Sequence, residues 1–195
     1  MSGDALRKPT ARRLQILLRI KHPTLDPEVI TRSVGIEPEE TINAGASVSR
    51  GVRKVHSESY WLAELSLPTG SEIIAAVANE RLSFSFDAPK LRALTANLAD
   101  FTSPRLSATE RAKPDPRGLD ARAASDLVRS PAFLDLVLLA RLLSLQPHRE
   151  FFRRVRTDGG SATLLVQLPD RDAPITITPA LARRLADLDV EMEID

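Results

Sequence analysis

Residues 14–35 read LQILLRIKHPTLDPEVITRSVG, and this stretch decides the fold. In its first half, apolar residues alternate with other residues. The alternating apolar positions are Leu14, Ile16, Leu18 and Ile20. A period of two is typical of a strand that buries one of its faces. A strand is therefore predicted here, ending before Pro23.

The second half of this stretch predicts a short helix. Asp26 can accept hydrogen bonds from free backbone N–H groups, and Pro27 suits the first helical position. Gly35 supplies the left-handed conformation that commonly ends a helix. The apolar stripe of this helix consists of Val29, Ile30 and Val34. A strand followed directly by a capped helix indicates a protein of mixed α and β structure.

The same patterns predict the remaining elements. Further strands are predicted at 60–67, 151–155, 162–168 and 190–194. Further helices are predicted after Ser71, Asp87, Asp120 and Thr178, and over 132–145. The Asp-Gly-Gly turn at 158–160 predicts a hairpin between two of these strands. Together they predict an α+β fold: a mostly antiparallel or mixed sheet of about five strands, with helices packed on one face.

The chain of 195 residues is long enough for one sizeable domain. Residues 1–12 are interpreted as a loose basic tail, and 13–195 as a single α+β domain. Within that domain, residues 101–119 combine three prolines with polar side chains and few apolar ones. This composition predicts a mobile loop.

Several short motifs resemble one known family. They are L-R-I at 18–20, L-D-P-E-V-I-T at 25–31 and G-I-E-P at 35–38, with Gly45 and Trp61 in a following loop and strand. Near the end of the chain, I-T-P-A-L at 177–181 and E-I-D at 193–195 add to the likeness. The chain resembles an uncharacterised bacterial family known as domain of unknown function 4279, over about 14–67 and 150–195. The resemblance implies no activity.

Composition excludes several classes of function. The chain has no cysteine, which rules out disulfides, thiol nucleophiles and Cys-ligated metals. Its net charge of +1 argues against a globally electrostatic binder. No secretory signal or membrane-length apolar run is visible, so we expect a cytoplasmic protein that does not bind membranes. We expect no cofactor and no metal.

The three histidines are His22, His56 and His148. None lies at a spacing typical of metal ligands. They are interpreted as solvent-exposed loop residues. No catalytic motif is recognised, so the catalytic residues stay unknown and the chain is more readily interpreted as non-enzymatic.

Two basic clusters are candidate binding sites, because arginine binds carboxylates and phosphates in a bidentate manner. The candidate ligand-binding residues are Arg50, Arg53, His56, Arg154 and Arg156. The last two belong to the strand predicted at 151–155 and its end. The favoured alternative is that these arginines pair with the protein's own acids. Nucleic-acid binding is a weaker alternative, because few aromatic residues lie among the arginines.

Three more features have a functional and a structural interpretation. Glu191, Glu193 and Asp195 share one face of the last predicted strand and could form a site, but a solvated face explains them equally well. Asp26 is explained by helix capping. Trp61 shares a face with apolar neighbours, so it is predicted to lie in the core rather than to stack on a ligand.

Three functional hypotheses remain open from the sequence. The leading one is a non-catalytic interaction protein, immunity-like or adaptor-like, with an unidentified protein partner. The second is a small-ligand or nucleic-acid binder that uses the arginine clusters. The third is an enzyme with a site assembled from scattered residues such as His56, Arg153 and Glu193. The very apolar helix over 132–145 further predicts a homodimer, unless other helices of the same chain cover it.

Overall fold

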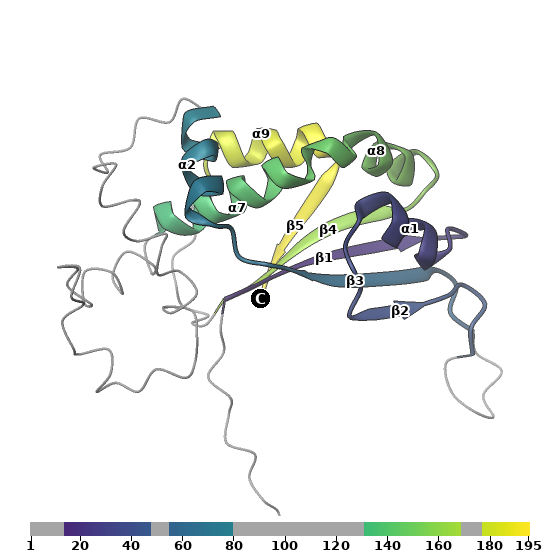
Figure 1. The fold of residues 1–195 in the computed structure, drawn as a ribbon. Helices are drawn as coiled ribbons and strands as arrows, with labels where there is room; N and C mark the ends of the chain where they lie inside the picture. Colours follow the sequence, from purple (N-terminus) through teal and green to yellow (C-terminus); the bar gives the residue numbers. More distant parts are fainter. Residues whose placement is uncertain (1–13, 48–54, 80–130, 169–176) are drawn as a thin grey trace, which may run out of the picture.

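Strands from both ends of the chain join in one mixed sheet (Figure 1). The computed structural model describes residues 14–47, 55–79, 131–168 and 177–195. Within these residues the strand order is β2-β3-β1-β4-β5. The strands are β1 Gln15–His22, β2 Glu40–Ile42, β3 Ser59–Leu65, β4 Ser161–Gln167 and β5 Val190–Ile194. Only β4 and β5 pair in parallel; the other described pairs are antiparallel.

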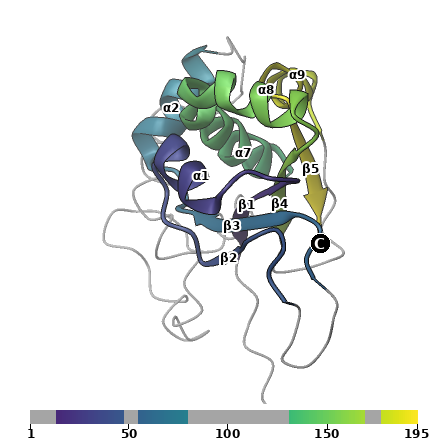
Figure 2. The same cartoon turned by 90° about the vertical axis from the view of Figure 1, so that its right-hand side faces the viewer.

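The helices of the described residues all lie on one side of this sheet (Figures 1 and 2). They are α1 Pro27–Val34, α2 Gly70–Asn79, α7 Pro131–Leu145, α8 Arg149–Thr157 and α9 Pro179–Leu188, with a 3₁₀ turn η1 at Gln146–His148. The predicted α+β fold, with about five strands and one helical layer, is confirmed.

Helix α1 begins and ends where the sequence predicts. The Asp26 carboxylate accepts a hydrogen bond from the backbone N–H of Glu28 at 2.8 Å. Gly35 adopts a φ of 71°, and its N–H bonds to the carbonyl of Thr31. The capping role of Asp26 accounts for its position. The last helix behaves likewise, because the Thr178 hydroxyl accepts from the N–H of Leu181 at 3.2 Å.

The alternating residues of β1 and β3 form the floor of the core. Ile16, Leu18 and Ile20 are fully buried, as is Trp61 on the neighbouring strand. The indole N–H of Trp61 donates to the hydroxyl of Thr31 on α1 at 3.0 Å. The prediction that Trp61 is a core residue is confirmed.

Helix α7 is the central helix of the layer. Its residues Phe133–Leu139 are buried throughout, although Asp135 lies among them. The helix contacts α2 and α9, which are its neighbours in the layer. Burial within a single chain accounts for its apolar surface, so the reason for expecting a dimer through 132–145 is removed. The dimer itself stays untested.

One predicted strand is wrong: residues 151–155 belong to helix α8. Phe152 and Val155 are its buried residues, and their i, i+3 spacing places both on one helical face. The turn at 158–160 therefore leads from a helix into β4 and forms no hairpin. Gly159 ends the helix with a φ of 84°. β4 pairs with β1 and β5 instead.

The predicted start of α2 after Ser71 is also corrected, because the helix begins at Gly70. Thr69, rather than Ser71, closes the helix start, because the Glu72 carboxylate accepts from the Thr69 N–H at 2.6 Å and from its hydroxyl at 2.8 Å. The Thr69 hydroxyl in turn accepts from the N–H of Glu72 at 3.4 Å. This reciprocal pair is a capping box with the spacing T-x-x-E.

Some predictions fall outside the described residues. They are the tail at 1–12, the loop at 101–119, and the helices expected after Asp87 and Asp120. In the described part of the chain, no helix is long and apolar enough to cross a membrane.

Candidate functional site

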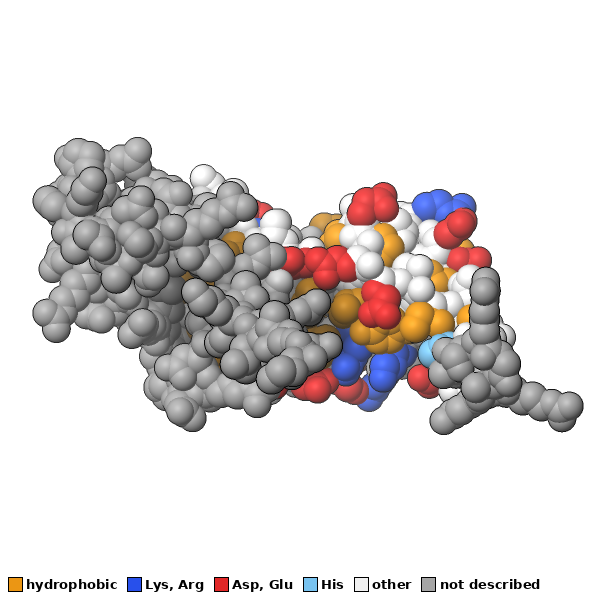
Figure 3. All heavy atoms as spheres, turned by 90° about the horizontal axis from the view of Figure 1, so that it is seen from below, with side chains coloured by type: hydrophobic (Ala, Val, Ile, Leu, Met, Phe, Trp, Pro, Cys, Tyr) orange, Lys and Arg blue, Asp and Glu red, His pale blue; other side chains and the backbone are white. Residues whose placement is uncertain are grey.

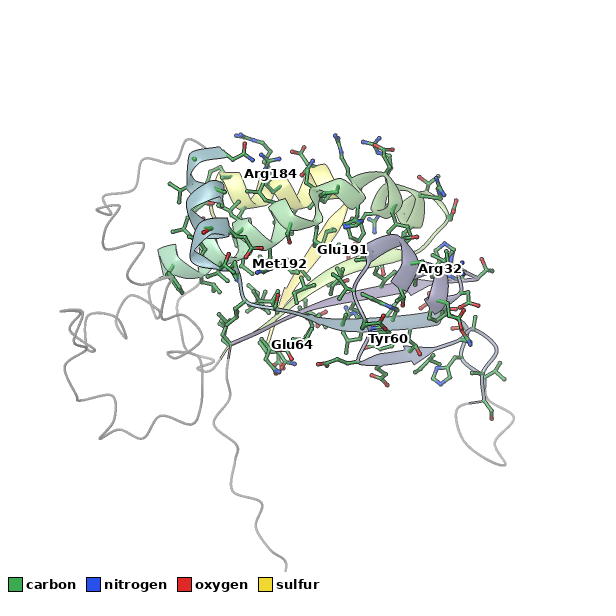
Figure 4. The ribbon with its side chains drawn as sticks, in the orientation of Figure 1. Arg32, Tyr60, Glu64, Arg184, Glu191 and Met192 are labelled. Carbon is green, nitrogen blue, oxygen red and sulfur yellow. The ribbon has the colours of Figure 1, made fainter. Side chains whose placement is uncertain are left out.

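The face of the sheet opposite the helices, here called the outer face, is the candidate site. Alternation along each strand and the cross-strand register decide which side chains it carries. Figure 4 shows Glu64 projecting from the side of the sheet away from the helices. The outer face consists of Gln15, Leu17, Arg19, Lys21, Glu40, Ile42, Tyr60, Leu62, Glu64, Ser161, Thr163, Leu165, Gln167, Glu191 and Glu193.

An apolar band crosses the outer face diagonally from β2 to β4. Ile42 lies opposite Tyr60, and Leu17 lies opposite Leu165, with Leu62 between these pairs. Leu17 is only 7% exposed, whereas the other four are half-buried. In Figure 3 the hydrophobic side chains of this face (orange) lie among acidic (red) and basic (blue) ones.

Arg19 is the central charge of the outer face. Its guanidinium donates to the Glu193 carboxylate on β5 at 2.8 Å, over the intervening strand β4. Its Nε is buried and has no hydrogen-bond partner. The positive charge is therefore matched by Glu193, while one of its donors is left without an acceptor.

Acids lie on both sides of the band. Glu40 and Glu64 flank it on β2 and β3, and Glu191 and Glu193 lie on the far edge strand. Burial raises the pKa of the Tyr60 hydroxyl, the Glu40 carboxylate adds to this rise, and Arg19 opposes it. Tyr60 thus stays protonated and can act as a hydrogen-bond donor at neutral pH.

The predicted arginine site is not assembled as a clamp. Arg154 and Arg156 lie on exposed positions of helix α8, not on a strand. Arg156 donates to Glu191 at 2.8 Å, and Arg153 pairs with Glu150 one turn earlier at 3.1 Å. Pairing with the protein's own acids is therefore observed for Arg153 and Arg156.

Of the other predicted ligand residues, His56 alone belongs to the described part of the chain. Arg50 and Arg53 lie outside the described residues. His56 is half-buried beside β3, where its backbone N–H bonds to the carbonyl of Ala46 at 2.9 Å. In the described structure, no hydrogen bond or ion pair joins the side chain of His56 to Arg154 or Arg156.

The exposed-loop interpretation of the histidines is wrong for His22. This residue ends β1 and is 5% exposed. Its Nδ1 accepts from the backbone N–H groups of Thr24 and Leu25, at 3.1 and 2.8 Å, which fixes the turn into α1. Among the described residues, no group of three or more acids and histidines could hold a metal.

The scattered-residue enzyme site is not brought together either. His56 follows the loop before β3, Arg153 lies on α8 and Glu193 lies on β5. Arg153 and Glu193 each have a different partner, Glu150 and Arg19 respectively. Both side chains are thus engaged by other residues of this chain, and the enzyme hypothesis itself stays a prediction.

Two charged residues on α7 are buried, and the sequence analysis assigned neither a role. Asp135 accepts from the Thr178 hydroxyl at 3.0 Å, which ties α7 to the start of α9. Burial raises the pKa of Asp135, against the opposing effect of the Thr178 hydrogen bonds. Arg141 is 7% exposed and reaches Glu72 of α2 at 3.3 Å. Both residues hold the helical layer together.

The comparisons with known proteins bear on one part of the chain. Residues 12–88 match a family described as a domain of unknown function (DUF4279). The resemblance recognised in the opening motifs is thereby confirmed over these residues. No curated protein and no solved structure matches the chain.

The DUF4279 match spans β1, α1, β2, β3 and α2 of the described structure. It thus includes most of the apolar band, with Glu40 and Glu64 on its flank. Strands β4 and β5 lie beyond it, so the likeness noted at 177–181 and 193–195 stays a prediction. The sequence had singled out Glu191 and Glu193 but not the band, whose residues come from four separate strands.

Proposed function

We propose that the chain is a non-catalytic interaction protein that contacts a protein partner through the outer face of its sheet. The supporting observation is the diagonal apolar band on the side of the sheet opposite the helices. In the described part of the chain no helix lies over this other face (Figure 1), which makes it the side of the sheet that we assign to a contact. We place this protein in the cytoplasm, in keeping with its lack of cysteine.

The composition of the outer face suits a reversible protein contact. Interfaces of that kind are about as apolar as the rest of a protein surface, with aromatic residues enriched and a polar rim. Tyr60 and Leu62 supply the apolar centre, and ion pairs such as Arg19–Glu193 supply a rim. The rim also discourages unwanted pairing at the β5 edge, because charged residues on edge strands oppose aggregation.

The outer face is less suited to nucleic acid. A sheet that binds single strands needs a cationic surface and several aromatic residues for base stacking. Tyr60 is the one aromatic residue of the outer face, and acids outnumber bases there. The arginines of α8 are partly engaged by acids of this chain. A protein partner is therefore favoured over nucleic acid.

Site-specific photo-crosslinking in the native cells tests this proposal. A benzophenone amino acid replaces Leu62 on the outer face or, as the matched control, Ala182 on the exposed side of α9. We expect a discrete crosslinked protein from position 62 and none from position 182. Crosslinks confined to position 182, or none from either position, would contradict the proposal.

A further inference from the structure

Resting on the proposed function, we infer that the partner contributes an amphipathic helix whose apolar stripe is flanked by lysine and arginine. The inference comes from the shape of the band, the sign of the charges around it and the burial of this chain's own helices.

The dimensions of the band match one helix. The band crosses four neighbouring strands, which at about 4.8 Å apart gives about 14 Å, and it rises about 13 Å along the strands. Its diagonal is therefore about 19 Å. An α-helix of about 13 residues spans this length, and its width of about 10 to 12 Å leaves room for flanking charges.

A helix suits the face of a sheet better than an extended segment does. Strands pair at the edges of a sheet, where backbone N–H and C=O groups are available. An extended segment laid on the face would leave its own backbone groups without partners. A helix satisfies its backbone internally and presents a continuous apolar stripe at i, i+3, i+4 and i+7.

The charges around the band specify a basic helix. Acids outnumber bases on the outer face, with Glu40 and Glu64 on one side of the band and Glu191 and Glu193 on the other. Arg19 pairs with Glu193, and Arg156 of α8 pairs with Glu191, so both acids of β5 already have a cation of this chain. The acids that bear on the charge of a partner are therefore those on the β2 and β3 side of the band, Glu40 in particular. The whole chain carries a net charge of +1, so attraction of a cation depends on this local excess of acid.

A second copy of the chain does not offer such a helix among its described residues. The buried residues of α8, Phe152 and Val155, face its own core, and so do Leu181 and Leu188 of α9. Two outer faces would also bring acids against acids, which is unfavourable. The described helices of a second copy are therefore not the helix that we infer, and we assign it to another protein.

Fluorescence anisotropy with synthetic helices tests the inference on the full chain. The probe is a labelled peptide of about 14 residues with leucine at helical spacing and lysine elsewhere. Its two controls are a peptide with glutamate in place of every lysine, and a lysine peptide with the leucines scattered around the helix. We expect the leucine–lysine helix to bind at least about tenfold more tightly than either, and more weakly as salt rises.

Matched charge reversals assign the binding to the outer face. Glu40→Lys places a cation beside the band, whereas Glu150→Lys makes the same change on α8. We expect Glu40→Lys to weaken binding by at least about tenfold and Glu150→Lys by less than about twofold. Circular dichroism confirms that both variants are folded.

Three outcomes would overturn the inference: preference for the glutamate peptide, equal binding of the scattered peptide, or equal effects of the two reversals. If the crosslink from position 62 is nevertheless obtained, the outer face remains a contact surface, and only the basic helix is wrong. If that crosslink also fails, the proposed function is contradicted as well.

Discussion

At the scale of single residues, Trp61 contributes most clearly to stability. It is fully buried, and its indole N–H has the Thr31 hydroxyl as acceptor. Trp61, Ala63 and Leu65 are two residues apart and so share one face of a strand, and this pattern was enough to predict that Trp61 lies in the core. The hydrogen bond could not be predicted, because it depends on how α1 lies over β3.

Replacing Trp61 with alanine should therefore lower the free energy of unfolding by about 3 to 5 kcal/mol. Tyr60→Ala is the matched control on the half-buried outer face and should cost clearly less. Urea unfolding followed by circular dichroism measures both. Native Trp61 fluorescence should be blue-shifted and poorly quenched by iodide; a readily quenched spectrum would place the ring on the surface.

The two glycines before β4 should respond differently to substitution. A Cβ on Gly160 would meet the carbonyl oxygen of Lys21 at 2.6 Å and the ring of His22 at 2.8 Å. A Cβ on Gly159 would meet no close neighbour. An alanine there would be strained only by the φ of 84°, which should lower the stability of the fold by about 1 to 2 kcal/mol. Gly160→Ala should therefore lower the thermal midpoint more than Gly159→Ala, and the reverse order would contradict the close approach of this turn to β1.

At the scale of elements, periodicity predicted long elements well and short apolar runs poorly. Residues 151–155 contain two phenylalanines and a valine, which suit a strand or a buried helix face alike. On a strand, Arg154 and Arg156 would share a face with Phe152, and Arg153 would share the other face with Phe151 and Val155. Neither face would be wholly apolar, and this was the available signal for a helix. Strand β2 has three residues, too few for any period to be visible.

The candidate site was predicted only in part, for a related reason. The row of acids on β5 follows one strand and is visible in sequence. The apolar band takes residues from β2, β3, β1 and β4, so it depends on the strand order and register. The partners of Arg19 and Arg156 likewise lie 174 and 35 residues away in sequence.

The junction of α7 with α9 should make stability depend on pH. Burial raises the pKa of Asp135 above its ordinary value of 3.8, so the folded state holds this proton to a higher pH than the unfolded chain. Its contribution to stability is fully present at low pH and declines as pH rises through that window.

Asp135→Asn should remove this decline while its amide oxygen still accepts from Thr178. Urea unfolding between about pH 4 and about pH 7 measures the effect, with the native chain as reference. The variant should gain stability relative to the native chain as pH rises. An unchanged difference across this range would show that Asp135 does not hold its proton as described.

At the scale of the whole molecule, the helical layer and the outer face have different roles. Buried contacts such as Asp135–Thr178 and Arg141–Glu72 hold the helices to one another. The outer face has no described helix over it. Almost all described apolar residues of α7 are buried within its own chain. The helix therefore has, in its described part, no large apolar surface left that would require a second copy to cover it.

Sedimentation equilibrium at micromolar concentration therefore should give a species of 21.4 kDa. A dimer would restore self-association as a role of this protein, through a surface other than the buried side of α7. Leu62→Asp would then identify the surface, because a dimer through the outer face would dissociate.

The most direct test of the central claim, that the outer face is a contact surface, is nuclear magnetic resonance of the ¹⁵N-labelled chain titrated with the leucine–lysine helix. The account predicts that amide shifts concentrate at Ile42, Leu62 and Leu165, from three separate strands. Shifts concentrated on α8 and α9, with these three unmoved, would contradict it.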